Sequence, residues 1–106
     1  MNAWITLVSV EALAPGMHLA AALDDTQIVV YNLDGEYYAI EDICSHDGGP
    51  LTGGVVEGDN IVCPRHGARF CLRTGAALSA PAYEPIHTFP LRIENGMVQV
   101  RDNRWD

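Results

Sequence analysis

Lysine is absent from this chain, and its basic residues are six arginines set against fourteen acidic residues, so the net charge is −8 over 106 residues. A nucleic-acid-binding surface needs clustered positive charge to neutralise phosphates, and this balance therefore argues against a nucleic-acid partner. It argues equally against binding to an anionic membrane surface. The uses that remain for the acidity are solubility and the attraction of a positively charged protein partner.

Long apolar runs are also missing. The longest apolar-rich segment, residues 17–23, is far shorter than the ~18 residues of a membrane span, and the N-terminus lacks the basic and apolar regions of a signal peptide. We therefore expect a cytoplasmic protein with no membrane association. In that reducing compartment Cys44, Cys63 and Cys71 are better candidates for metal ligands or free thiols than for a disulfide.

Helical periodicity over three or more turns is missing as well, and short apolar segments alternate instead with turn residues. Asp34-Gly35 and Asn95-Gly96 each separate two apolar segments and predict hairpins with type I′ turns, whose strands partly alternate apolar and polar residues as half-buried strands do. The sequence predicts an all-β fold, a small β-sandwich or barrel, in one domain spanning residues 1–106. The predicted strands cover residues 4–8, 17–23, 27–32, 36–41, 91–94 and 97–101.

The middle of the chain differs from both ends. Residues 42–51 and 63–75 are rich in glycine, proline, histidine and cysteine, and we interpret them as loops on the β scaffold, where functional residues tend to lie. The first loop contains Cys44-Ser45-His46 and the second contains Cys63-Pro64-Arg65-His66, with sixteen residues between His46 and Cys63.

Each of these two motifs offers one thiolate and one imidazole, which are ligands that suit iron and zinc. In an extended segment Cys44 and His46 project to the same side, and Cys63 and His66 are spaced as the ends of a β-turn. Two loops with equivalent ligand sets fit a two-iron cluster with both thiolates on one iron and both imidazoles on the other. Gly48 and Gly67 would let the backbone approach the cluster and direct N–H groups at its sulfurs.

This arrangement resembles the Rieske [2Fe–2S] signature. The resemblance implies a β base, a two-loop cluster-binding subdomain, and a third, proline-bearing loop that covers the cluster, for which residues 80–85 with Pro81 are the candidate. It further implies that Cys44 and Cys63 hold the inner iron, and that His46 and His66 hold the outer, solvent-facing iron. Cofactor binding is thus expected of these four residues.

Departures from the respiratory Rieske pattern are informative. Respiratory members carry an extra, disulfide-forming cysteine in each loop, where this chain has Gly49 and Arg65. They also carry a serine and a tyrosine that donate to cluster sulfur and to a ligand thiolate, where this chain has Ala68 and Phe70. Since such hydrogen bonds raise the potential, we expect a value near the low end of the Rieske range, roughly −150 mV.

The chain therefore resembles the ferredoxins of bacterial aromatic-ring-hydroxylating dioxygenase systems. That resemblance implies a soluble, monomeric one-electron carrier, not itself an enzyme, which accepts electrons from an NAD(P)H-dependent flavoprotein reductase and passes them to a terminal oxygenase through transient complexes. For docking we consider Arg65 and, among acidic residues, Asp42, Asp47, Glu57 and Glu84.

Two alternatives remain open. One is a Rieske-like small subunit of an assimilatory nitrite reductase, and the other is a zinc-stabilised interaction module, which is less consistent with motifs that mix ligand types. Cys71 is interpreted as a small buried or half-buried strand residue. His18 and His87 have no cysteine or carboxylate at ligand spacing and are interpreted as non-ligands.

Overall fold

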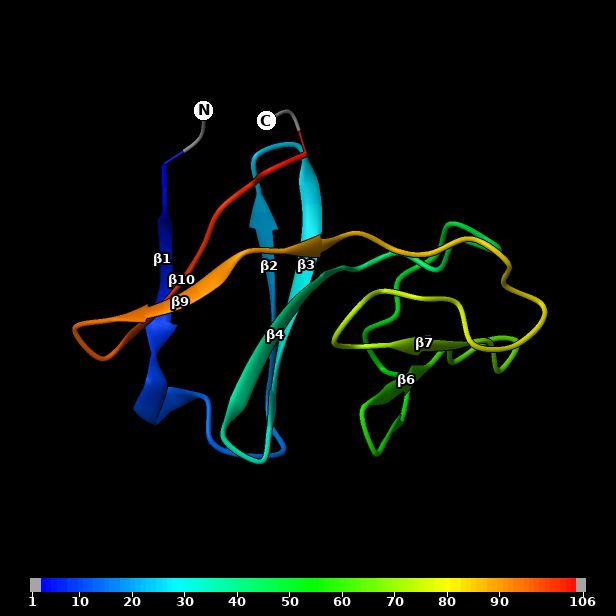
Figure 1. Cartoon of the computed structure of the whole chain (residues 1–106), viewed down its shortest axis with the longest axis horizontal. Coiled ribbons are helices and arrows are strands. Elements are labelled where there is room, and N and C mark those ends of the chain that lie inside the picture. The colour runs from blue at the N-terminus through cyan, green and yellow to red at the C-terminus, as the bar shows by residue number, and fades with distance from the viewer. Residues whose placement is uncertain (1–2, 105–106) are drawn as a thin grey trace.

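Strands dominate the computed structural model, which describes residues 3–104 (Figure 1). Its only helical element among these residues is one short 3-10 turn, and none of them forms a helix long and apolar enough to cross a membrane. The all-β prediction is confirmed. The elements in chain order are β1 (Ile5–Ser9), η1 (Val10–Ala12), β2 (His18–Leu23), β3 (Thr26–Leu33), β4 (Glu36–Glu41), β5 (Val56–Glu57), β6 (Asn60–Val62), β7 (Arg69–Cys71), β8 (Thr88–Phe89), β9 (Leu91–Glu94) and β10 (Met97–Val100).

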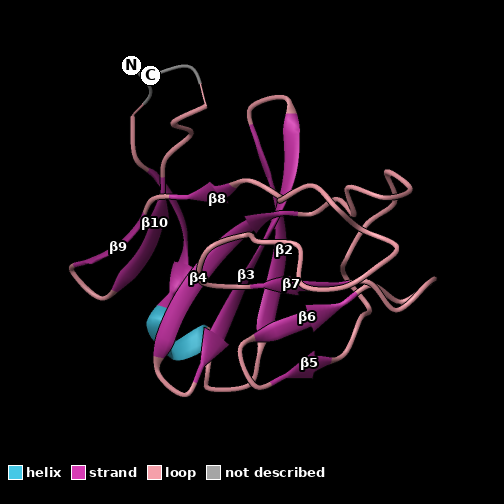
Figure 2. Cartoon of the chain, turned by 45° about the vertical axis from the view of Figure 1, so that its right-hand side comes forward, coloured by secondary structure: helices cyan, strands magenta, loops and turns pink. Residues whose placement is uncertain are grey.

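The strands form three antiparallel sheets, which Figure 2 shows from the side of the loops. The first has the order β1-β10-β9, the second β2-β3-β4-β8 and the third β5-β6-β7. The first two sheets belong to the base, our name for β1–β4 and β8–β10. The third belongs to the loop half, our name for residues 42–86, which the chain inserts between β4 and β8.

Both predicted hairpins are present, and their turns explain the registers. Asp34 and Gly35 have φ of 52° and 97°, and Asn95 and Gly96 have φ of 53° and 74°. Positive φ at two successive residues is the geometry of a type I′ turn, whose twist matches that of the flanking strands. The turns therefore fix β3 against β4 and β9 against β10.

The central strand β3 is buried on both faces, although its sequence led us to expect a half-buried strand. Ile28 and Val30 pack in the core between the first two sheets, whereas Val29 and Tyr31 pack in a second core beneath the loop half. Since successive side chains point to opposite faces of a sheet, covering both faces requires an apolar residue at almost every position. The second sheet thus serves both as half of the base and as the floor of the loop half.

The loop half contains more regular structure than its sequence predicted. Residues 63–75 were interpreted as a loop in which Cys71 alone was expected to be a strand residue, and the structure places β7 there, paired with β6. The strands β5, β6 and β8 were also missed, because segments of two or three residues carry no readable alternation. Cys71 lies in β7 and is half-buried, as expected.

Candidate metal centre

The two motif-bearing loops close in the same way, although their histidines follow the cysteines at different spacings. In each loop the cysteine N–H donates to the carbonyl oxygen five residues later, and the cysteine carbonyl accepts from a glycine four residues later. These distances are 2.7 and 2.8 Å for Cys44 and Gly48, and 2.7 and 3.1 Å for Cys63 and Gly67. Both glycines have positive φ, 77° and 75°, which L-residues with side chains adopt rarely. The two loops therefore have the same backbone hydrogen-bonding pattern around their cysteines, and each loop positions one thiol.

The roles expected of Gly48 and Gly67 need correction. Their N–H groups were expected to point at the cluster sulfurs, but they donate to the cysteine carbonyls and so close the loops. The backbone N–H groups that face the sulfur of Cys44 are those of His46 and Asp47. The extended start of the loop, rather than its glycine, supplies these donors.

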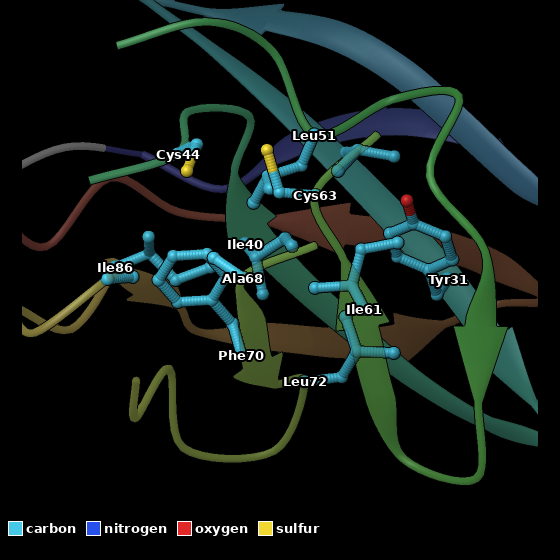
Figure 3. Close-up of a cluster of buried hydrophobic side chains, with 12 residues drawn as sticks. Tyr31, Ile40, Cys44, Leu51, Ile61, Cys63, Ala68, Phe70, Leu72 and Ile86 are labelled. Atoms are coloured by element: carbon cyan, nitrogen blue, oxygen red, sulfur yellow. The ribbon is translucent and has the colours of Figure 1, made fainter. Parts of the chain in front are cut away.

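The two thiols lie together in the core beneath the loops (Figure 3). Cys44 is 0% exposed and Cys63 is 2% exposed, and apolar side chains such as Leu51 and Phe70 belong to the same core. Burial raises the pKa of the Cys44 thiol, because a thiolate loses its hydration there. Two adjacent thiolates in such a place need a cation between them, which is what a metal centre provides.

The two imidazoles lie together at the surface. The ring centroids of His46 and His66 are 5.1 Å apart, with the planes at 84° to each other, and both residues are exposed. The side chain of His66 keeps 54% of its surface accessible. The four candidate ligands thus divide into a buried sulfur pair and an exposed nitrogen pair.

This division tests which metal group the residues fit. Among residues 3–104, candidate ligand atoms within 4.8 Å of one another form two groups, one of Cys44, Asp47 and Cys63 and one of His46, Asp47 and His66. Neither group contains both a thiol and an imidazole, whereas a tetrahedral zinc site would bring all four ligands round one ion. The donor set fits a two-iron cluster with sulfur and nitrogen ligands on different irons.

A third loop packs against the first. The hydroxyl of Ser45 donates to the Glu84 carbonyl at 2.6 Å, and Ala82 is buried in the core that contains the two cysteines. Pro81 follows Ala80 through a cis peptide bond in this loop and is half-buried. The structure therefore brings the loop with Pro81 to the site, as the sequence predicted.

The docking candidates Arg65 and Asp47 face each other. The Arg65 Nε donates to Asp47 Oδ2 at 2.5 Å, and this guanidinium holds the pKa of the Asp47 carboxyl well below its usual range. Glu57 is likewise paired, with Arg69, at 2.5 Å. Glu84, like Asp47 and Glu57, is exposed, whereas Asp42 is half-buried.

Asp42 has a structural role that sequence reasoning missed. Its Oδ1 accepts from the N–H groups of Leu51 and Thr52 at 2.8 and 2.9 Å, and its Oδ2 accepts from the Thr52 hydroxyl at 2.6 Å. The carboxylate therefore ties the entrance of the first loop to its exit. The partners lie nine and ten residues away, beyond the range of local capping patterns, so the sequence gives no signal for it.

Comparison with known proteins decides the family. A model of the Rieske [2Fe-2S] domain matches residues 3–90. The chain belongs to the Rieske [2Fe–2S] domain family. The biphenyl dioxygenase ferredoxin subunit of Pseudomonas sp. (strain KKS102) is 38% identical over 97 residues, which cover 91% of this chain and 89% of that protein.

Two solved structures are similar to this Rieske protein over nearly its whole length. One is a ferredoxin–oxygenase complex of carbazole 1,9a-dioxygenase, whose matching chain has 30% identity and a TM-score of 0.86 and covers 92% of each chain. The other, assigned as an NADH-dependent nitrite reductase small subunit of Mycobacterium tuberculosis, has 25% identity and a TM-score of 0.84 and covers 96% of each chain. The cofactor of the family is a Rieske [2Fe–2S] cluster with cysteine and histidine ligands.

Proposed function

We propose that this protein is the one-electron carrier of an aromatic-ring-hydroxylating dioxygenase system. It accepts electrons from an NAD(P)H-dependent flavoprotein reductase and delivers them to a terminal oxygenase, and it works as a cytoplasmic monomer that binds each partner transiently. The similarity to dioxygenase ferredoxins over about nine-tenths of both chains supports this role.

The observation that carries the proposal is the division between buried thiols and exposed imidazoles. Cys44 and Cys63 would hold one iron within the core, where apolar neighbours keep water away from the sulfurs. His46 and His66 would hold the other iron, and their exposed rings form the surface through which a partner comes nearest to the centre. A bound [2Fe–2S] cluster supplies reversible one-electron chemistry.

The ligand assignment is tested by removing one thiol at a time. Cys63→Ala should abolish the brown colour and the EPR signal of the dithionite-reduced protein, because a thiolate ligand of the cluster is lost. Cys71→Ala is the matched control, since this cysteine lies in β7 of the same half and is not in the ligand set. Loss of the cluster in the control, or its retention in Cys63→Ala, would overturn the assignment.

The carrier role is tested with partner proteins. Stopped-flow mixing of the reduced protein with an oxidised ring-hydroxylating oxygenase should oxidise its cluster within one turnover, so that the visible absorption of the oxidised form returns. A flavoprotein reductase with NADH should then reduce the cluster and bleach this absorption again. Neither step should occur with the apoprotein. A protein that carries the cluster but exchanges electrons with neither component would contradict the carrier role while leaving the ligand assignment intact.

The nitrite reductase subunit remains the second candidate, because a chain assigned to that class has nearly the same fold. A subunit stays with its catalytic partner, whereas a carrier dissociates between partners. Affinity purification from the source cell at physiological salt separates the two. Stable recovery of a large catalytic subunit in equal amount would favour the nitrite reductase subunit.

A further inference from the structure

A guanidinium bridge joins the two metal-binding loops at their exposed rim. Arg65 belongs to the second loop, and all three of its contacts are to atoms of the first. Its Nε and Nη2 donate to the two carboxylate oxygens of Asp47 at 2.5 and 3.0 Å, and its Nη1 donates to the Pro50 carbonyl at 2.8 Å. Such a two-pronged contact fixes both distance and orientation, which a single ion pair does not.

The first loop is shaped to receive this guanidinium. A methyl group built on Gly49 would lie 2.7 Å from the Cζ of Arg65. The guanidinium therefore lies directly against the backbone of Gly49, and a side chain at that position would displace it. The carboxylate is itself held in place, because Asp47 Oδ1 accepts from the Gly49 N–H at 2.9 Å. The bridge therefore depends on Arg65 of the second loop and on Asp47 and Gly49 of the first.

The bridge also lies beside a proposed ligand. Asp47 Oδ2 is 3.9 Å from His66 Nε2, on the exposed side of the centre. One positive and one negative charge thus lie together near the place where reduction would add a negative charge. Each charge alone would shift the energy of that reduction, in opposite directions, and together they largely cancel.

We propose that Arg65 and Asp47 are positioning residues of the metal centre, which lock the two loops at a fixed separation and hold a neutral pair of charges beside the imidazoles. The proposal rests on the ligand set of the proposed function. The pairing gives Arg65 and Asp47 a role within the chain, separate from the partner docking that the sequence led us to expect of them. Exposed ion pairs usually contribute little, but this pair is two-pronged, adds a backbone acceptor and spans two loops.

The first test measures how fast the cluster is lost. Arg65→Gln and Asp47→Asn should each speed the chelator-driven loss of visible absorbance by about tenfold, as removal of groups that orient ligands commonly does. The double variant should lose its cluster no faster than the faster single variant, because one interaction is removed in all three. Arg69→Gln is the matched control, because the Arg69–Glu57 pair lies in the same half without joining the two loops, and it should stay within about twofold.

The second test measures the reduction potential of the same variants. If the pair only held the loops together, loss of either residue would not shift the potential in opposite directions. Arg65→Gln leaves the carboxylate uncompensated and should lower the potential. Asp47→Asn leaves the guanidinium uncompensated and should raise it, and the double variant should return close to the wild-type value. Arg65→Lys keeps the positive charge but cannot make the two-pronged contact with Asp47. It should therefore keep the wild-type potential while losing the cluster faster.

The results separate this proposal from the proposed function, because neither test uses a partner protein. Equal loss rates in Arg65→Gln and Arg69→Gln, or shifts of both single variants in the same direction, would overturn the bridge alone. A wild-type protein without a Rieske spectrum would overturn the ligand set and the bridge together. A carrier that fails only with its partners would leave the bridge standing.

Discussion

The base and the loop half are ordered by different means. In the base, β3 is paired along six positions with β2 and along six with β4, so continuous ladders hold these three strands together. In the loop half the longest ladder, between β6 and β7, spans three positions. Short ladders with long loops between them do not hold a fold by backbone pairing alone.

Close packing replaces the missing ladders. A methyl group added at any of three glycines of the loop half would lie within 3 Å of another group, whereas at the base glycines it would meet nothing within 4 Å. The former are Gly49, Gly54 and Gly75, and the latter are Gly16, Gly35 and Gly96. The base glycines serve backbone conformation, whereas the loop half contains both kinds, because Gly48 and Gly67 also meet nothing within 4 Å and have positive φ. At positions 49, 54 and 75 the loop half leaves no room for a side chain without movement of a neighbouring group, and with its short ladders it should depend more than the base on a bound metal cluster.

Removal of the metal gives the largest test of this comparison. We expect chelation of the iron to raise hydrogen exchange sharply at the N–H groups that close the two loops, with their opening free energy falling toward about 0 kcal/mol. In β3 the opening free energy should remain at about 5 kcal/mol or more, because its two ladders and the core between the first two sheets contain none of the candidate ligands. Hydrogen exchange with mass spectrometry on holo- and apoprotein measures both. Equal deprotection of β3 would show that the two regions unfold as one.

A substitution at a close-approach glycine comes next in size. In Gly54→Ala the new methyl would lie 2.0 Å from the Val62 carbonyl oxygen, so the backbone must shift, and we expect a loss of about 3 kcal/mol in unfolding free energy. Gly96→Ala is the control in the base, where only the left-handed backbone resists a side chain and about 1 kcal/mol is expected. Urea unfolding of both holoproteins measures the difference. Similar losses would contradict the contrast between the two classes of glycine.

The same contrast explains which parts of the fold the sequence predicts. Asp34-Gly35 and Asn95-Gly96 encode their hairpins locally, since only residues that tolerate positive φ fit those turns. The need for glycine at position 54, which lies outside any strand, arises from the carbonyl of Val62, eight residues along the chain in β6. Sequence patterns report local backbone preference and periodicity, but they do not report which distant group a residue will meet. The missed strands of the loop half, each two or three residues long, have the same cause.

The candidate site follows the same division. The spacing of cysteine and histidine in each motif is local, and the structure brings the four residues together as the motifs predict. The partners of Asp42 and Arg65 belong to tertiary structure, and no local sequence pattern indicates that Arg65 pairs with Asp47 rather than with solvent or a protein partner. The proximity of the four candidate ligands is thus predictable from sequence, whereas the contacts that orient them are not.

The ion pair between Asp102 and Arg104 lies outside the loop half and can be tested by acid titration. Asp102 is 1% exposed, and hydrogen bonds from Arg104 lower its pKa to about 2. Its usual value in an unfolded chain is about 3.9, so the folded state binds the proton less well. The stabilisation is therefore complete above about pH 4 and is lost as the pH falls toward about 2. Unfolding free energies of wild type and Asp102→Asn measured in this range should converge as the pH falls, and parallel curves would contradict the assignment.

Alanine-to-serine substitutions, one in the core of each region, are expected to have the smallest effects. Ala68 and Ala39 are both buried, at 0% and 2% exposure, the first in the core with the two cysteines and the second in the core of the base. Ala68→Ser places a hydroxyl where respiratory Rieske proteins have one, and a hydrogen bond of about 1.4 kcal/mol to the reduced cluster would raise the potential by about 60 mV. Ala39→Ser should cost about 1 kcal/mol of unfolding free energy and leave the potential unchanged, because its hydroxyl meets only the base. Protein-film voltammetry measures the reduction potential of both variants. A shift in Ala39→Ser as large as that in Ala68→Ser would show that the potential responds to the fold as a whole rather than to hydrogen-bond donors at the loops.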